Sequence, residues 1–168
     1  RTGVINAEAP GTYNLIYTAT DGSGNAATPY LVKVIVKDMV APEVTLKGDN
    51  PMIVDVYTLF VDPGVNVQDN YYPNVFPVIT DLPNMSTLGT YTMTYTVTDG
   101  AGNTTIVTRA VKVVDRIAPE IQLLGANPVK HIRYTPFADS SVKINDNYYT
   151  NAQLQPLLQM NTTGLDVN

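Results

Sequence analysis

The stretch GTYTMTYTVTDGAGN at residues 89–103 decides the fold, because the chain carries it twice. An earlier copy, GTYNLIYTATDGSGN, occupies residues 11–25. In the later copy Tyr91, Met93, Tyr95 and Val97 alternate with threonines, a period of two that puts apolar groups on one face of a strand and hydroxyls on the other. The glycines and side-chain oxygens of DGAGN suit a chain reversal. The stretch therefore predicts a half-buried antiparallel strand, a turn and a returning strand.

A second similarity extends the repeat in both directions. DMVAPE at residues 38–43 recurs as DRIAPE at residues 115–120, and DNYY at residues 69–72 recurs at residues 146–149, both at an offset of 77. The GTY copies are 78 apart, so one copy has an extra residue after the turn, which predicts a β-bulge. We expect one complete repeat at residues 38–115, the second half of a repeat at residues 1–37 and the first half of another at residues 116–168.

Short strands are expected throughout the complete repeat, at residues 43–47, 52–56, 65–69, 75–80, 91–98 and 104–114. Six or seven short strands in about 77 residues, separated by turns every 8–12 residues, predict an all-β fold of tandem Ig-like sandwiches. Neither partial repeat can close a sandwich by itself. The third copy is longer after Tyr149, and the segment from Gln153 to Leu158 is where a short helical turn is expected.

Composition argues against several classes of function. The chain has 10 basic and 15 acidic residues, so it lacks the positive charge of a nucleic-acid-binding protein. No apolar run approaches the roughly 18 residues of a membrane span, and no cysteine is present to act as a nucleophile or a metal ligand. His131, the one histidine, occupies a strand position that the complete repeat fills with Val54, and no serine nucleophile motif occurs. We expect no enzymatic activity.

The order APEVTLKG, VDPGVNVQDN and GTYTMTYTVTDGAGN, followed by a strand that ends in Asp115, resembles the bacterial surface Ig-like domains related to hyalin repeats. The resemblance covers the whole chain in repeating form. It implies an extracellular location on the bacterial cell surface and a structural role, as a stalk segment of a large adhesin or filament whose immediate partners are its own neighbouring repeats. One departure is DNYYP at residues 69–73, where such domains often carry DNxDG.

Oxygen-bearing side chains are expected to meet at one pole of the complete repeat, beside the linker. Two strands of the repeat should end at this pole, one before Asp69 and the other at residues 91–98, and the linker itself adds Asp38. The set consists of Asp38, Asp69, Asn70, Asp99 and Asn103. Calcium binds six to eight such oxygens with tolerant geometry, so a calcium site at the junction is one interpretation. The other is that these residues only cap turns.

Two tyrosine pairs suggest a second kind of site, made of Tyr71, Tyr72, Tyr148 and Tyr149. Adjacent residues face opposite ways, so one ring of each pair should be exposed, where it could stack on a sugar or contact a receptor. A module that binds a surface glycan or a host protein is therefore one alternative to the stalk. A second alternative is a filament in which the two half repeats of successive copies complete one another.

Overall fold

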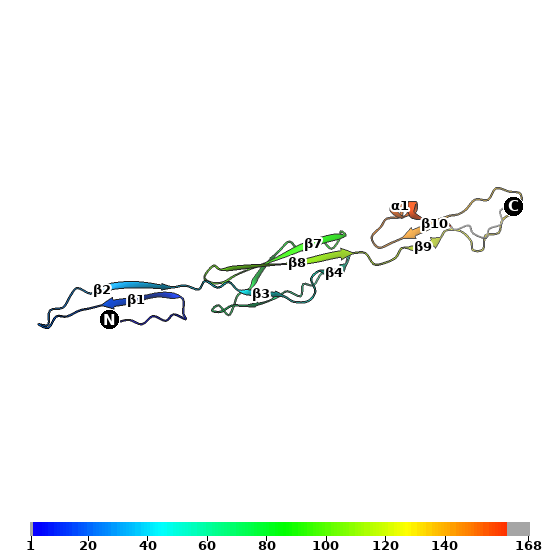
Figure 1. Cartoon of the computed structure of the whole chain (residues 1–168). Coiled ribbons are helices and arrows are strands. Elements are labelled where there is room, and N and C mark those ends of the chain that lie inside the picture. The colour runs from blue at the N-terminus through cyan, green and yellow to red at the C-terminus, as the bar shows by residue number, and fades with distance from the viewer. Residues whose placement is uncertain (1, 161–168) are drawn as a thin grey trace.

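The computed structural model describes residues 2–160, so the end of the predicted third repeat, residues 161–168, lies outside the described part. Three groups of strands follow one another along an elongated molecule (Figure 1). The first is the hairpin of β1 (Gly11–Tyr17) and β2 (Tyr30–Val36). The central group contains β3 (Glu43–Leu46), β4 (Met52–Asp55), β5 (Val65–Gln68), β6 (Pro77–Thr80), β7 (Gly89–Thr98) and β8 (Thr104–Val114). The third contains β9 (Glu120–Leu123), β10 (Val142–Asn145), the helix α1 (Asn151–Leu154) and the 3-10 turn η1 (Gln155–Leu157).

The central group is a two-sheet sandwich, and all six strands predicted there are present. One sheet has the order β4-β8-β7-β6, with β4 parallel to β8 and the other pairs antiparallel. The second sheet is the antiparallel pair of β3 and β5. Met93 and Tyr95 of β7 and Val111 of β8 form the buried core, and Leu46 and Val65 of the second sheet pack against it. The alternation read from the sequence thus places its apolar face inside.

Tyr91 has a different role from Tyr95, although the alternation of the strand places both on its apolar face. Tyr95 is fully buried, whereas the Tyr91 hydroxyl donates to the Thr87 carbonyl at 2.9 Å. Tyr13 repeats this contact in the first group by donating to the Ala9 carbonyl at 2.8 Å. The corner tyrosine is therefore a feature of both copies of the strand.

The one-residue shift between the two copies lies in the first hairpin. Tyr17 faces Tyr30 and Thr20 faces Ala26, so two residues on one strand oppose three on the other. In the central group the pairs Gly89↔Val113 and Thr98↔Thr104 belong to one uninterrupted register. The extra residue is accommodated as a local disruption of the ladder, which is the behaviour expected of a bulge.

The third group is the least enclosed part of the described chain. β9 and β10 form a two-stranded antiparallel sheet, on which Ile144 is buried while Ile121 remains 59% exposed. The predicted helical turn is confirmed as α1 and η1, and α1 contains no buried residue. None of the helices within residues 2–160 has the length and hydrophobicity of a membrane span.

Candidate functional site

Three segments meet at the junction between the first and central groups. The linker continues directly from β2 and carries Asp38, the end of β5 carries Asp69 and Asn70, and the β7–β8 turn carries Asp99 and Asn103. β5 and β7 both run towards the linker, so their last residues arrive at the same pole. The structure therefore brings together all five residues proposed from the sequence as oxygen ligands.

The three carboxylates form the centre of this carboxylate cluster, which we define as Asp38, Asp69 and Asp99. One oxygen of each side chain lies within 4.8 Å of the others. Asp38 and Asp99 are only 7% exposed, and Asp69 is half-buried. The two ion pairs identified within residues 2–160 involve Asp62 and Asp55, so no arginine or lysine in that range neutralises the cluster.

Most hydrogen bonds to the cluster go to one oxygen of each carboxylate. Asp38 Oδ1 accepts from the Val40 N–H at 3.1 Å, and Asp69 Oδ1 accepts from the N–H groups of Tyr71 and Tyr72 at 2.9 and 2.7 Å. The Oδ2 atoms of Asp38 and Asp69 are buried and have no hydrogen-bond partner within residues 2–160. Because buried polar atoms are nearly always partnered, these two oxygens require an explanation.

Asp99 organises the turn that follows β7. Its Oδ1 accepts from the N–H groups of Ala101 and Asn103 at 2.9 and 2.8 Å, and its Oδ2 accepts from Asn103 Nδ2 at 2.8 Å. Burial raises the pKa of the Asp99 carboxyl group, but the hydrogen bonds from Asn103, Ala101 and Gly102 outweigh it, and the pKa lies below its ordinary value. Asp99 is therefore ionised at neutral pH.

The two asparagines contribute amide nitrogens that tie the linker to the central group. Asn103 Nδ2 lies 3.3 Å from the carbonyl oxygens of Asp38 and Val40, and Asn70 Nδ2 donates to Asp38 Oδ1 at 3.2 Å. Thr105 adds a 2.6 Å bond from its hydroxyl to the carbonyl of the buried Pro42. In this arrangement the asparagines hold the chain that presents the carboxylates.

Tyr72 packs directly beside the cluster. A Cβ atom at Gly100 would lie 2.4 Å from the Tyr72 ring, so the ring covers the turn where glycine leaves room for it. Partial burial raises the pKa of the Tyr72 hydroxyl, and the negative charges of Asp99, Asp38 and Asp69 raise it further. This shift places the ring within the electrostatic reach of all three carboxylates.

The tyrosine pairs differ in which ring is exposed. Tyr71 is 42% exposed and lies edge-on to Tyr72, beside a hollow of about 310 Å³ that Pro10 and Met39 also line. In the second pair Tyr149 is the exposed ring, at 40%. The centroid of the Tyr148 ring lies 6.0 Å from that of Tyr57, and the Tyr148 hydroxyl accepts from the Leu88 N–H at 3.5 Å. The equivalent of Leu88 in the first group is Pro10, which has no N–H to donate.

The second junction reproduces part of the cluster. Asp115 Oδ1 accepts from the Ile117 N–H at 3.1 Å, as Asp38 does from Val40, and Asp146 Oδ1 accepts from the N–H groups of Tyr148 and Tyr149 at 2.8 and 2.7 Å. Within residues 2–160 no third carboxylate joins them. The second junction instead has a salt bridge from Arg116 to Asp55 at 2.7 Å.

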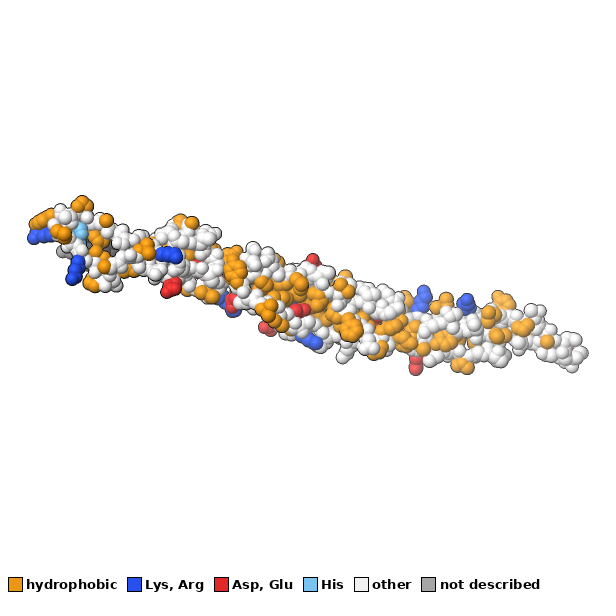
Figure 2. Space-filling view, turned by 180° about the vertical axis from the view of Figure 1, so that it is seen from behind, with side chains coloured by type: hydrophobic (Ala, Val, Ile, Leu, Met, Phe, Trp, Pro, Cys, Tyr) orange, Lys and Arg blue, Asp and Glu red, His pale blue; other side chains and the backbone are white. Residues whose placement is uncertain are grey.

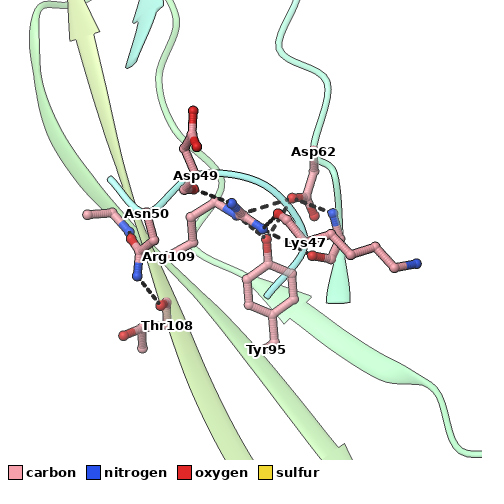
Figure 3. Close-up of polar contacts among 9 residues, drawn as sticks. Lys47, Asp49, Asn50, Asp62, Tyr95, Thr108 and Arg109 are labelled. Atoms are coloured by element: carbon pink, nitrogen blue, oxygen red, sulfur yellow. Dashed lines mark hydrogen bonds and ion pairs between the residues drawn. The ribbon is translucent and has the colours of Figure 1, made fainter. Parts of the chain in front are cut away.

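A polar network that the sequence did not predict lies towards the opposite pole of the central group. Arg109 is fully buried and donates to the carbonyls of Lys47, Gly64 and Asp49 and to the Tyr95 hydroxyl, and its Nε lies 3.5 Å from Asp62 Oδ1 (Figure 3). The signal was present: Arg109 stands in an inward-facing position of β8, two residues before the buried Val111. A charged residue in that position requires several partners.

His131 lies in the exposed turn of the third group. Its Nε2 is 2.9 Å from the Thr135 carbonyl, and its ring packs edge-on against Phe137. These contacts explain the side chain as part of a local turn.

Parts of the chain are similar to known protein families and proteins. Residues 44–113 match the family model described as bacterial surface protein, Ig-like domain. The chain is 27% identical over 110 residues to Internalin I of Listeria monocytogenes, an alignment that covers 59% of the chain and 6% of that protein. It is 33% identical over 115 residues to an uncharacterized 81.3 kDa protein of Acholeplasma phage L2, covering 65% of the chain and 15% of that protein. A crystal structure of a lipoprotein from Bacteroides thetaiotaomicron aligns with 46% of the chain and 39% of its own length at 25% identity, with a TM-score of 0.40.

Proposed function

We propose that the chain is a spacer segment of a surface protein, built of successive Ig-like repeats that hold another part of that protein away from the cell. The premise is the match of residues 44–113 to the family model of bacterial surface Ig-like domains. The proposal concerns a segment, because the chain spans only 6% and 15% of the lengths of the relatives that it matches. Its action is mechanical: each repeat contributes its own stability and that of its contact with the next repeat.

The observation that carries the proposal is that both linkers are held by the central group. At the first junction Asn103 and Thr105 bond three carbonyls of residues 38–42. At the second, Arg116 pairs with Asp55, and Tyr148 packs on Tyr57. A linker that is hydrogen-bonded to its neighbour transmits orientation, whereas a free Gly/Ser-rich linker behaves as a random coil.

The narrow shape of the molecule supports the spacer role. Figure 2 shows a narrow body on which hydrophobic and charged side chains recur along the length. The exposed tyrosines Tyr71 and Tyr149 each lie against the other ring of their pair, which favours packing near the junctions over a platform for a glycan. The glycan-binding alternative predicts that binding is lost when Tyr71 and Tyr72 are both changed to alanine.

Small-angle X-ray scattering on the 168-residue chain tests the proposal. We expect a rod-like profile, and we expect the double substitution Ala41→Gly and Pro42→Gly to shorten the mean maximum dimension by freeing the first linker. Ser23→Gly, in the exposed turn between β1 and β2, is the control and should leave the profile unchanged. A wild-type profile that already shows independently moving groups would contradict a spacer role.

A further inference from the structure

We propose that Asp38, Asp69 and Asp99 bind a divalent cation, with calcium as the best match, and that this ion fastens the first linker to the central group. Binding of the ion does not depend on the spacer role. A chain that bends freely at the second junction would not be a spacer, yet it could still bind the ion at the first junction.

The cluster concentrates negative charge in a buried place. Two of the three carboxylates are more than nine-tenths buried, one oxygen of each lies within 4.8 Å of the others, and within residues 2–160 no arginine or lysine pairs with them. Buried like charges at such separations repel strongly and are costly unless a positive group compensates them. A bound cation supplies that compensation.

Hydrogen bonds hold Asp38 and Asp69 by one oxygen each. Backbone N–H groups and Asn70 occupy the Oδ1 atoms of Asp38 and Asp69, which fixes the orientation of both carboxylates. Their Oδ2 atoms are buried and have no partner in the described part of the chain, and Asp38 itself is only 7% exposed. Each of these carboxylates is therefore held by one oxygen and leaves the other oxygen free. A carboxylate that binds a metal ion has this arrangement.

The donor set selects the kind of ion. All three ligands are carboxylate oxygens, which suit calcium, magnesium or manganese, whereas zinc and copper favour histidine and cysteine. Oxygens around calcium lie at 2.3–2.6 Å from the ion, so any two of them are at most about 4.6–5.2 Å apart. The 4.8 Å limit of the cluster fits this shell, and calcium tolerates the irregular geometry of three ligands from three separate segments better than magnesium does.

The ion would join parts of the chain that are far apart in sequence. Asp38 belongs to the linker, Asp69 follows β5, and Asp99 begins the β7–β8 turn. Binding would therefore hold the linker to the central group in addition to the bonds from Asn103. With three protein ligands, we expect an affinity in the range of extracellular calcium modules, with Kd about 10⁻⁴ to 10⁻³ M.

The chain contains two positions that separate metal binding from turn formation. Asp21 in the first group accepts from the Ser23 and Asn25 N–H groups and from Asn25 Nδ2, much as Asp99 does in its own turn. It is exposed, however, and belongs to no group of three carboxylates within residues 2–160. Asp146 accepts from two tyrosine N–H groups, as Asp69 does. Asp21→Asn and Asp146→Asn are therefore matched controls for changes within the cluster.

The experiment is a calcium titration of the full 168-residue chain by calorimetry, with thermal unfolding followed in EDTA and in 10 mM calcium chloride. We expect about one calcium bound per chain and a melting temperature that is higher in calcium. In the Asp38→Asn, Asp69→Asn double variant both effects should disappear, and in the Asp21→Asn, Asp146→Asn double variant both should remain. Asparagine preserves the Oδ1 acceptor at each position, so the double variant is expected to fold.

Two results would overturn the proposal. One is a wild-type chain whose heat signal and melting temperature are the same with and without calcium, and this test does not depend on any variant folding. The other is a response that is equal in the cluster variant and the control variant, which would show that calcium binds elsewhere.

A local probe sharpens the assignment. Terbium(III) occupies calcium sites and emits when a nearby tyrosine is excited, and Tyr72 lies beside the cluster. Tyr71 lies edge-on to Tyr72, so both rings can transfer energy to the ion. We expect sensitised emission from the wild type, a large loss in the Tyr71→Phe, Tyr72→Phe double variant and displacement by calcium. Emission that the double variant leaves unchanged would place the ion away from this cluster and contradict the proposal.

Discussion

Two segments with closely related sequences, residues 43–72 and 120–149, differ in the strands that they form. Both form the antiparallel pair that begins a repeat, β3 with β5 and β9 with β10. The segment between those strands differs: Met52–Asp55 is the strand β4 in the first case, whereas residues 129–132 form no strand in the second. β4 owes its existence to its parallel partner β8, and the third group has no equivalent of β8 within residues 2–160.

Local contacts, in contrast, are the same in both segments. The hydroxyl of Thr58 donates to the Asp55 carbonyl at 2.6 Å, and that of Thr135 donates to the Ile132 carbonyl at 2.7 Å. Tyr57 and Tyr134 both have positive φ, at 60° and 64°. Turn chemistry is thus encoded within a few residues, while a strand requires a neighbour that supplies its hydrogen bonds.

Amide hydrogen exchange should show the largest difference between the two segments. The N–H groups that β4 donates to β8 should exchange only through opening of the central sandwich, whereas those of residues 130–132 should exchange almost freely. For a domain of ordinary stability the protection factors should differ by about 10³-fold or more. Similar protection in both segments would contradict the dependence of β4 on β8.

Removing Arg109 should destabilise the central group. In Arg109→Leu the carbonyls of Lys47, Asp49 and Gly64 and the Asp62 carboxylate lose their shared partner. We expect the free energy of unfolding to fall by about 3–5 kcal/mol, the usual cost of breaking a buried ion pair, measured by urea denaturation. Lys112→Leu, at an exposed position on the same strand, should change it by less than about 0.5 kcal/mol.

Tyr91→Phe tests the corner that the first and central groups share. The change removes the hydrogen bond from the Tyr91 hydroxyl to the Thr87 carbonyl and leaves the ring in place. We expect a loss of about 0.5–1.5 kcal/mol. Because the Thr87 carbonyl can still reach solvent, a much larger loss would indicate that the corner supports more than this bond. Tyr13→Phe should have a smaller effect on the main unfolding transition, since the first group is a single hairpin.

Arg116→Met should have the smallest effect, and its pH dependence is its signature. The hydrogen bond and charge of Arg116 lower the pKa of Asp55, so the stabilising contribution of the pair is present above about pH 4. It is lost as the pH falls through the lowered pKa, where the carboxylate becomes protonated. The variant, which copies Met39 of the first linker, should therefore differ from wild type at pH 7 and converge with it near pH 2. A difference that persists at pH 2 would assign the effect to packing.

Much of the fold followed from the sequence because its signals are local or repeated. The alternation of residues 91–98 predicted both a strand and its buried face, and Met93, Tyr95 and Val97 are fully buried. The linker copies are 77 residues apart and the GTY copies are 78 apart. This difference of one residue predicted the bulge, which lies in the first hairpin. The helical turn after Tyr149 was also confirmed. The exact bounds of the three repeats, their number in the whole protein and the relation to hyalin repeats stay predictions.

The candidate site was predicted in part. Chain direction alone indicated that Asp38, Asp69, Asn70, Asp99 and Asn103 would meet, and they do. The sequence did not distinguish the roles of these side chains, since hydrogen-bond direction depends on atoms 30 or more residues apart. In the structure the asparagines act as donors to the linker, and the buried Oδ2 atoms belong to Asp38 and Asp69.

The sequence by itself determined the strand pattern, the turns and the repeat, because each depends on side chains a few residues apart or on similarity between copies. Only the tertiary structure decided that β4 forms a strand while residues 129–132 do not, that Arg109 gathers three backbone carbonyls, and that Tyr148 rather than Tyr149 is covered. The reason is physical: hydrogen-bond partners and burial are supplied by segments distant in sequence, and the same residues reach different states where those segments differ.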